Sequence, residues 1–398
     1  MNRNVHLLLV AQFLSAFADN ALLFTAIALV LHSADLAAWY IPALQASFLV
    51  AFVIFAPWVG VVADRHCKVR VLFGANGIKA LGAGLLMLGV DPLAAYAVAG
   101  VGAAFYGPAK YGILPELLGR ERLVAANGLI EGTTIVAIVS GALAGGSVAD
   151  RSVPLALAAV IACYLASALI VLGMTRTPIR ITERLPAVRY FAGMTRTLLS
   201  TSRALFATLG VTLFWSSAAV LRVMVVAWAP IVLALRSTED IAALTLFSAI
   251  GVALGAFIAP RLIPLDNLRR ARFAAYGMGI CIILLAITDA LWPARMALLA
   301  AGIAGGIFVV PVNATLQEIG HRTLGAGGAV AVQQFFENLG MLTATGIYAY
   351  AAGQGADPVV SLLTLGVLVM LATMLVSWHL PEVENLVLEP PRTPRTPR

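Results

Sequence analysis

Residues 11–31 of the chain read AQFLSAFADNALLFTAIALVL, which is long enough to cross a bilayer as a helix. Asp19 and Asn20 lie near the middle of this stretch. A carboxylate at the centre of a membrane costs about 2.5 to 3.5 kcal/mol on insertion scales. The stretch itself contains no basic residue that could offset this cost. We therefore predict that the rest of the chain surrounds Asp19 with a cavity and supplies its partner.

The composition of the 398-residue chain, 61% hydrophobic and 11% charged, is typical of a polytopic helical membrane protein. Soluble domains carry about 25% charged residues. The apolar runs are about twenty residues long, which excludes the alternating ten-residue strands of a membrane barrel. The net charge of +7 does not indicate nucleic-acid binding, because the basic residues lie in short loops between the runs. The three cysteines and five histidines lack metal-ligand spacing, and no nucleophile and base are paired, so we expect neither an enzyme nor a metal or cofactor site.

Twelve apolar spans predict an all-α polytopic membrane protein with twelve transmembrane helices in two pseudo-symmetric six-helix halves. The N-terminal half covers residues 1–175 and the C-terminal half residues 204–380. A basic linker, 176–203, joins the halves, and residues 381–398 are expected to be a disordered tail. The predicted spans are 6–31, 37–63, 71–90, 93–114, 123–149, 154–174, 204–233, 241–259, 273–288, 295–316, 325–351 and 358–380.

The distribution of the 26 Lys and Arg residues predicts that both termini are cytoplasmic. Lys79, Lys110 and Arg222 fall within spans, and only Arg151, Arg236 and Arg295 lie in loops on the opposite side. The other 20 lie on the side of the termini. Basic loops stay on the cytoplasmic side of a membrane, so the expected location is a bacterial inner membrane crossed many times.

A weak internal repeat relates the two halves. Residues 108–116 read PAKYGILPE and are followed by NGLIE at 127–131. Residues 311–318 read PVNATLQE and are followed by QQFFE at 333–337. The repeat places Glu131 and Glu337 at matching positions of the fifth and eleventh spans. Duplicated halves with a site at their interface are a transporter architecture.

The loop between the second and third spans contains GVVADR at 60–65, followed by Lys68 and Arg70. It resembles the loop signature of the major facilitator superfamily, although Cys67 stands where that signature has its second glycine. We predict a gate in which Asp64 caps the start of a helix, and Asp64, Arg65 and Arg70 form charge pairs that favour one gating state. The alternative is a loop that only sets topology.

Asp19, Arg222 and Glu337 lie at comparable depths in spans one, seven and eleven, counted at 1.5 Å per residue from the cytoplasmic ends. If these spans line a central cavity, the three side chains can meet there across the two halves. Ionisable groups inside a membrane mark functional sites by default, and a guanidinium presents a planar fork that suits phosphate. The alternative is a structural ion-pair network that holds helices together.

Three further buried charges have two interpretations each. Glu131 precedes Gly132 and two threonines, so it can line the cavity or accept hydrogen bonds beside it. Lys110, in GPAKYG, can bind a headgroup or reach toward the membrane interface. For Lys79, on the third span, we favour a role in helix packing, because that span is usually peripheral in this architecture.

Four phrases resemble the bacterial lysophospholipid transporter family: AQFLSAFADNALLFTAIAL in span one, GVGAAFYGPAKYGILPELL at 100–118, VAANGLIEGTTIVAI in span five and AVAVQQFFENLGML in span eleven. The resemblance runs over residues 5–378. It implies a flippase that moves lysophosphatidylethanolamine, lysophosphatidylglycerol and similar one-chain lipids from the outer to the inner leaflet. A cytoplasmic-face acyltransferase/acyl-carrier-protein synthetase then re-acylates these lipids.

The resemblance also implies a set of substrate-binding residues and a monomeric protein that works by alternating access. Arg222 would hold the phosphate, and Asp19 or Glu337 would hold an ethanolamine ammonium. The substrate-binding residues implied by the match are Asp19, Asn20, Lys110, Arg222, Glu337 and Asn338, to which the buried Glu131 is added.

Two other functions stay open at this point. A drug or solute/proton antiporter of the same superfamily would use Asp19 or Glu337 as its proton carrier. A membrane scaffold would only recruit the acyltransferase and would move no lipid.

Overall fold

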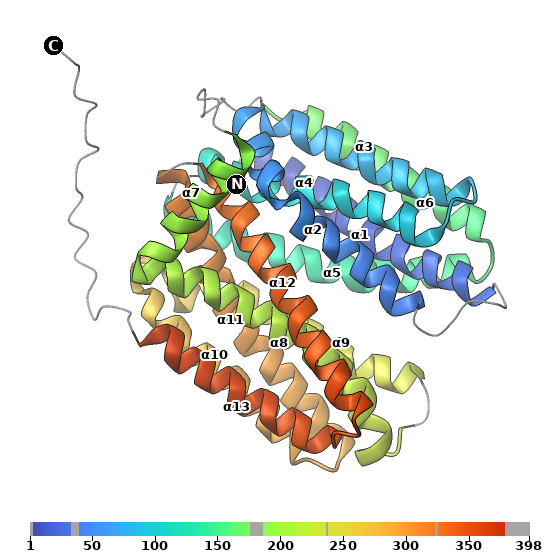
Figure 1. The fold of residues 1–398 in the computed structure, drawn as a ribbon, viewed down its shortest axis with the longest axis vertical. Coiled ribbons are helices and arrows are strands. Elements are labelled where there is room, and N and C mark those ends of the chain that lie inside the picture. The colour runs from blue at the N-terminus through green and yellow to red at the C-terminus, as the bar shows by residue number, and fades with distance from the viewer. Residues whose placement is uncertain are drawn as a thin grey trace.

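The computed structural model describes residues 3–32, 40–118, 120–175, 186–235, 238–322 and 325–378. Its helices alternate with short connections, and the chain folds back on itself after almost every one (Figure 1). The predicted tail at 381–398 and the basic residues Arg176, Arg180 and Arg184 of the linker lie outside the described residues. The α-helices are α1 (Arg3–His32), α2 (Tyr40–Arg65), α3 (Lys68–Met87), α4 (Pro92–Leu118), α5 (Leu123–Ala149), α6 (Val153–Leu172), α7 (Ala187–Ser200), α8 (Ser202–Val232), α9 (Thr238–Leu262), α10 (Ala271–Ala286), α11 (Leu291–Arg322), α12 (Ala326–Gly353) and α13 (Pro358–Ser377), with 3-10 turns at Arg120–Arg122 and Leu265–Arg270.

Several helices begin where the sequence provides a cap. Ser152 accepts a hydrogen bond from the Leu155 amide, and Asp357 accepts bonds from the amides of Val359 and Val360. Both helices have proline in their first turn, where a missing N–H costs nothing. These signals fix the starts of α6 and α13 within two residues of their predicted positions.

Apart from the short α7, twelve long helices form the bundle, which confirms the predicted fold. Helices α1 to α6 pack on one another, as do helices α8 to α13 (Figure 1). In the first half, α1 lies between α5 and α6, and α4 lies between α2 and α3. In the second half, α11 lies between α9 and α10, and α8 lies between α12 and α13. The boundaries given above for the halves and the linker stay a prediction.

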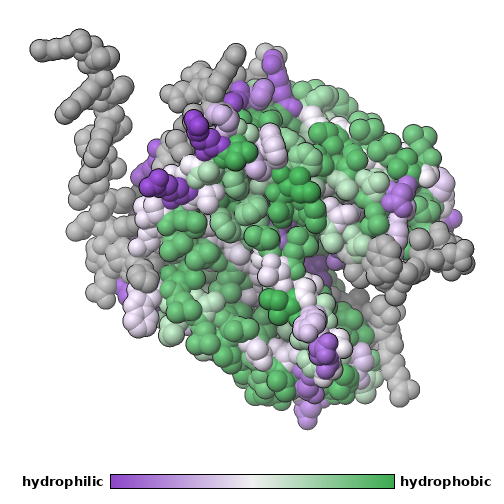
Figure 2. All heavy atoms as spheres, in the orientation of Figure 1, coloured by the Kyte–Doolittle hydropathy of each residue, from purple (hydrophilic) through white to green (hydrophobic). Residues whose placement is uncertain are grey.

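Nine helices in the described part of the chain are long and apolar enough to cross a membrane. They are α1, α2, α3, α5, α6, α8, α9, α11 and α13. The visible surface is hydrophobic over most of its area, with hydrophilic residues gathered mainly toward the ends of the helices (Figure 2). This distribution is that of a multi-pass membrane protein.

The linker contains a helix that the span pattern did not predict. Helix α7 buries Tyr190, Met194 and Leu198, one residue from each successive turn. It packs against α2, α8 and α12, so it touches both halves. We call the end of the molecule that carries the N-terminus and α7 the α7 end.

The two halves contact each other closely at the α7 end and diverge toward the opposite end (Figure 1). Helix α2 packs on α12, and α5 packs on α9. At Gly128 of α5, an added Cβ would lie 2.5 Å from the carbonyl oxygen of Ala256 in α9. The absence of a side chain there allows the two backbones to touch and closes the interface.

Candidate functional site

Asp19 has its partner within its own half. The Nζ atom of Lys79 on α3 lies 2.8 Å from Oδ2 of Asp19 and donates a second hydrogen bond of 2.9 Å to Ser15. The hydroxyl of Tyr164 on α6 donates to Oδ1 of Asp19 at 2.8 Å. Lys79 is only 1% exposed, and its ammonium lies 4.6 Å from the centre of the Tyr106 ring. The cation and the hydroxyl donor offset the cost of burying the Asp19 carboxylate. They are the partners that a charge in the middle of residues 11–31 requires.

This geometry corrects two expectations. Asp19 does not form an ion pair with Arg222 or Glu337. Lys79 is the cation that neutralises Asp19 rather than a peripheral packing residue. The reason is that α3 turns Lys79 inward, where Gly102 of α4 leaves room for the lysine side chain. An added Cβ at Gly102 would lie 2.7 Å from Cγ of Lys79.

A polar chain behind this pair ties three helices of the N-terminal half together. Ser15 donates to Oδ1 of Asn76 at 2.9 Å, and Asn76 donates to Ser167 at 2.9 Å. Ser167 in turn donates to the carbonyl of Ala11 at 2.7 Å. All these groups are buried. Because buried polar groups left unpaired are costly, the chain of bonds holds α1, α3 and α6 in one register.

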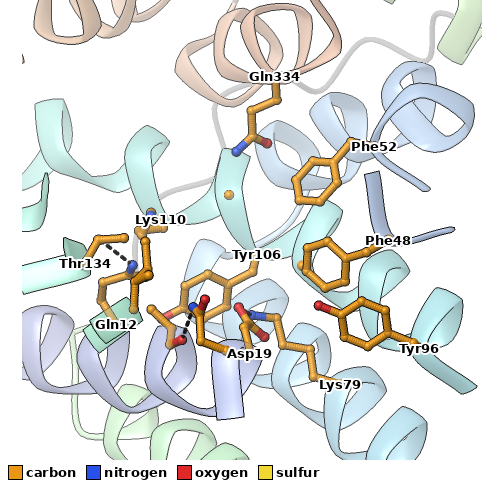
Figure 3. Close-up of a pocket in the computed structure, with 15 residues that line it drawn as sticks. Gln12, Asp19, Phe48, Phe52, Lys79, Tyr96, Tyr106, Lys110, Thr134 and Gln334 are labelled. Carbon is orange, nitrogen blue, oxygen red and sulfur yellow. Dashed lines mark hydrogen bonds and ion pairs between the residues drawn. The ribbon is translucent and has the colours of Figure 1, made fainter. Parts of the chain in front are cut away.

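Asp19 and Lys79 lie at the wall of a cavity of about 240 Å³ (Figure 3). Phe48, Phe52 and Tyr96 form an aromatic wall on the other side, with Phe48 and Tyr96 stacked at 5.0 Å. The volume corresponds to about eight water molecules. The cavity therefore offers a charged region and an apolar region in a space suited to a small polar group. The remaining lining residues are Gln12, Ala16, Asn20, Ala103, Tyr106, Gly107, Lys110, Thr134, Ile138 and Gln334.

Lys110 and Gln334 bring both halves to this cavity (Figure 3). Lys110 on α4 is 7% exposed, and its ammonium lies 4.1 Å from the centre of the Tyr111 ring. It forms no ion pair with any residue that the structure describes. Gln334 of α12 packs directly on Gly107 of α4. A buried cation with no carboxylate within 4 Å in the described residues, at the wall of a cavity, is a place where an anionic group would bind.

Glu131 and Glu337 belong to one buried hydrogen-bond network that crosses between the halves. Oε1 of Glu131 accepts bonds from the Tyr111 hydroxyl at 2.7 Å and from Asn313 at 3.1 Å. Gln333 donates to Oδ1 of Asn313 at 2.7 Å and to Oε1 of Glu337 at 2.6 Å. The two carboxylates at matching repeat positions are therefore linked through two amides, and neither lines the cavity around Asp19.

Asn20 and Asn338 have matching local roles. Each follows an acidic residue and donates to the carbonyl four residues earlier on its own helix, Ala16 at 2.9 Å and Gln334 at 2.7 Å. Asn20 lines the cavity, whereas Asn338 is buried and does not. Their oxygens stay available as acceptors.

Arg222 lies on the exposed face of α8 and forms no ion pair with any described residue. Gly340 of α12 abuts Ser216 of α8, and both helices start at the α7 end. At 1.5 Å per residue, Arg222 lies about 9 Å farther from the α7 end than Ser216 does. Glu337 lies about 4.5 Å nearer to that end than Gly340 does, so the two charged residues lie at different depths. The predicted meeting of Asp19, Arg222 and Glu337 is therefore wrong for this conformation.

The direction of Arg222 follows from the packing of α8. Phe214 faces α11 at Gly305, and Thr212 faces α12 at Gly340. At 100° per residue, Arg222 lies about 80° from each of these positions, between them. Arg222 therefore lies on the side of α8 between its contacts with α11 and α12.

Asp64 closes the interface at the α7 end. Its carboxylate accepts hydrogen bonds from the backbone amides of Gly327 at 2.9 Å and Gly328 at 2.5 Å, in the first turn of α12. The Tyr190 hydroxyl of α7 donates a third bond at 2.9 Å. Burial and the neighbouring carboxylate raise the pKa of the Tyr190 phenol, so it stays protonated and donates. An anion at a helix N-terminus also interacts favourably with the helix dipole.

Glycine is required where Asp64 approaches α12. Gly325 has a positive φ of 146°, and an added Cβ there would lie 2.4 Å from the Asp64 carboxylate. Added Cβ atoms at Gly327 and Gly328 would collide with Ala63 and Tyr190. The sequence GAGGA at 325–329 therefore lets a carboxylate of the other half reach the amides of the helix.

The basic residues predicted for this gate are placed differently. Lys68 is buried, with Nζ 4.0 Å from Asp64 and 2.7 Å from Glu116 of α4. Arg65 is half-buried, and Arg70 is exposed and lines a groove between α2 and α3. Lys68, the first residue of α3, therefore supplies a cation beside Asp64.

A reciprocal amide pair adds a second closure at the same end. Asn127 of α5 donates to Gln317 of α11 at 2.9 Å and accepts from it at 2.6 Å. Both residues are buried. Nearby, Arg203 of α8 bonds Glu318 at 3.2 Å, and Arg322 bonds it at 3.0 Å. The amide pair joins the two halves. The two ion pairs link α8 and α11 within the C-terminal half beside it.

Sequence reasoning missed Lys79 as the partner of Asp19, and Lys68, Tyr190 and Gln334 as parts of the site and the gate. A signal existed for Tyr190, because Tyr190, Met194 and Leu198 recur every four residues in the basic linker, as on one face of an amphipathic helix.

Comparisons with known proteins agree with this arrangement. A family model described as Major Facilitator Superfamily matches residues 8–345. The lysophospholipid transporter LplT of Klebsiella pneumoniae is 43% identical over 361 residues, which cover 88% of this chain and 89% of the relative. LplT of Salmonella arizonae is 42% identical, with 92% of each chain covered. LplT of Escherichia coli is 40% identical, with 95% of this chain and 96% of the relative covered.

Solved structures share the fold at low sequence identity. The human organic anion transporter MFSD10 superposes with a TM-score of 0.76 at 14% identity, covering 94% of this chain and all of that one. A bacterial homologue of the iron transporter ferroportin, in an outward-facing state, gives a TM-score of 0.73 at 16% identity, with 95% of this chain and all of that one covered. The chain therefore belongs to the major facilitator superfamily and, within it, to the family of the bacterial lysophospholipid transporters.

Proposed function

We propose that the chain moves lysophospholipids such as lysophosphatidylethanolamine and lysophosphatidylglycerol from the outer to the inner leaflet of the bacterial inner membrane. The observation that carries the proposal is the cavity beside Lys110 and the Asp19–Lys79 pair, which joins a charged region to an aromatic wall. A lysophospholipid has the same division into a charged headgroup and an apolar chain. The names of relatives 40 to 43% identical give the same substrate class.

The headgroup is proposed to bind between Lys110 and Asp19. Lys110 has no carboxylate within 4 Å among the described residues, so it can hold the phosphate by charge-assisted hydrogen bonds. The Asp19 side chain is 21% exposed and can accept an ethanolamine ammonium while it keeps its bond to Lys79. The cavity of about 240 Å³ suits a headgroup, so the acyl chain must extend past the aromatic wall.

Arg222 is proposed to act earlier on the path. We propose that it faces the space between the halves on the side where they diverge, and it forms no ion pair with any described residue. A phosphate entering from that side would meet Arg222 first and Lys110 after it. This order replaces the single cluster of three charges expected from the sequence.

The closed α7 end supports a mechanism of alternating access. Asp64 and the Asn127–Gln317 pair hold the halves together at the α7 end while the opposite end is open to Arg222. Basic residues concentrate at this end, and we propose that it faces the cytoplasm, which makes the conformation outward-facing. Opening requires that the bound headgroup stabilise a state in which the bonds of Asp64 are broken.

A cytoplasmic-face acyltransferase/acyl-carrier-protein synthetase that re-acylates the delivered lipid is the proposed functional partner, and the transporter itself is proposed to be a monomer. The lipid would reach this partner at the α7 end. No part of the transport cycle proposed here needs a cofactor.

Uptake of labelled lysophosphatidylethanolamine by cells tests the headgroup site. Lys110→Ala and Arg222→Ala are expected to abolish uptake at unchanged membrane expression, and Lys110→Arg is expected to retain part of it. Arg295→Ala serves as a control, because Arg295 also lies in a helix but contacts the rings of Trp292 and Phe247 within its own half. Normal uptake by both alanine variants at positions 110 and 222 would refute the site.

A further inference from the structure

A second cavity lies on the outside of the N-terminal half, away from the proposed transport path. This groove, of about 310 Å³, runs between α2 and α3 over Phe105 of α4. Val62, Val71 and Ile78 contribute apolar walls, and His66 and Arg70 stand at its end nearest α7. The complete lining is Val62, His66, Arg70, Val71, Gly74, Ala75, Ile78 and Phe105.

The cationic end of the groove is available for a ligand. Arg70 is exposed and forms no ion pair with any described residue. Nδ1 of His66 lies 3.1 Å from the carbonyl oxygen of Val62, which leaves Nε2 without a described partner. A guanidinium binds phosphate oxygens in a bidentate manner, and an imidazole adds one more hydrogen bond.

The apolar end of the groove is open space at the surface. No atom lies within 4 Å of the position that a Cβ would take at Gly74. The surface around the groove exposes large apolar side chains on both helices, 57% for Ile54, 47% for Trp58 and 42% for Phe73. In a membrane protein such a surface faces acyl chains, so the groove opens to the bilayer.

We propose that this groove binds an anionic diacyl phospholipid of the surrounding bilayer, with its phosphate on Arg70 and His66 and one acyl chain along Gly74 and Ile78. The charge complementarity favours an anionic lipid over a zwitterionic one, since the described groove lining contains two basic groups and no acid. The site is separate from the transport cavity, because none of its lining residues lines that cavity. It does not depend on which lipid is transported.

The groove adjoins the gate. Val62 and His66 flank Asp64 in sequence, and Arg70 follows Lys68 on α3. A lipid held there would bridge the end of α2 and the start of α3, the segment that positions the Asp64 carboxylate.

Native mass spectrometry of the purified full chain, titrated with phosphatidylglycerol or phosphatidylcholine, tests the proposal. The wild type is expected to bind phosphatidylglycerol more tightly than phosphatidylcholine. Arg70→Ala and Gly74→Leu are expected to lower that affinity by about tenfold or more, the first by removing the phosphate ligand and the second by filling the groove.

Two matched variants control for charge and for bulk. Arg122→Ala removes an exposed arginine that lies outside the groove, at the turn before α5. Gly77→Leu adds the same side chain on the same helix at a position that is also open but does not line the groove. Both are expected to keep wild-type affinity, and size-exclusion profiles check that all four variants fold. Unchanged binding in both Arg70→Ala and Gly74→Leu, or equal or tighter binding of phosphatidylcholine, would overturn the proposal.

Discussion

The contact between Asp64 and α12 predicts that Asp64→Asn opens the α7 end. In the structure the carboxylate accepts three hydrogen bonds, from two backbone amides and the Tyr190 hydroxyl. A hydrogen bond to a charged group contributes about 2 kcal/mol and a neutral one about 1 kcal/mol. The asparagine amide keeps only one acceptor oxygen, so the variant loses one bond outright and weakens the other two, about 4 kcal/mol in all. The lost interaction of the carboxylate with the helix dipole adds about 0.5 kcal/mol to this loss. The smaller desolvation cost of the neutral amide offsets a part of the total.

A net loss of about 3 kcal/mol changes the ratio of closed to open molecules about 150-fold. Tyr190→Phe removes one of the three bonds, about 2 kcal/mol, and is expected to change this ratio about thirtyfold. Tyr276→Phe is the matched control, because Tyr276 lies on α10, within the C-terminal half and away from the gate.

Distances between spin labels at Glu121→Cys and Arg270→Cys provide the assay, with the three native cysteines replaced. Both label sites are exposed and lie on opposite halves at the α7 end. The wild type and Tyr276→Phe are expected to give a single short distance between the labels. Tyr190→Phe is expected to add a small population of molecules with a longer distance, and Asp64→Asn a large one. Identical distributions for wild type and Asp64→Asn, or a larger effect of Tyr190→Phe, would refute the reasoning.

Two further predictions concern the packing of the N-terminal half. Lys79→Ala leaves the Asp19 carboxylate without its cation and is expected to lower the free energy of unfolding by about 3 kcal/mol, measured as a fall in thermal midpoint. The double variant with Asp19→Ala should regain most of that loss, and a double variant less stable than Lys79→Ala would contradict the pairing. Gly145→Leu should destabilise the protein strongly, because its Cβ would lie 2.5 Å from Cα of Ala21, whereas Gly146→Leu, with open space around it, should match wild type in the same melting assay.

The fold could be predicted from the sequence because the bilayer fixes both the length and the polarity of each span. The start of α13 at Pro358 and both ends of α5, at Leu123 and Ala149, match the predicted positions, and the other bounds differ by one to six residues. The helix ends differ most where the helices extend beyond the bilayer. Helix α11 continues from Leu316 to Arg322, where hydropathy gives no signal.

The site was predictable only in part. The cost of burying Asp19 showed that a partner was needed, but sequence spacing does not say which helix faces it. Lys79 was assigned to packing, because α3 was expected at the periphery of the bundle. The internal repeat found Glu131 and Glu337, whereas their link through Asn313 and Gln333 depends on how α11 and α12 meet α5. Such contacts arise from tertiary packing and leave no local pattern.

Lipid translocation by the purified protein tests the central proposal most directly. Proteoliposomes that contain the chain are loaded externally with labelled lysophosphatidylethanolamine, and the lipid that becomes protected from external albumin extraction is measured over time. We predict protection well above that of liposomes without protein, and its loss in Lys110→Ala with no change in reconstitution. Protection at the level of protein-free liposomes, or equal protection with Lys110→Ala, would contradict a transport site formed by Lys110 beside the Asp19–Lys79 pair.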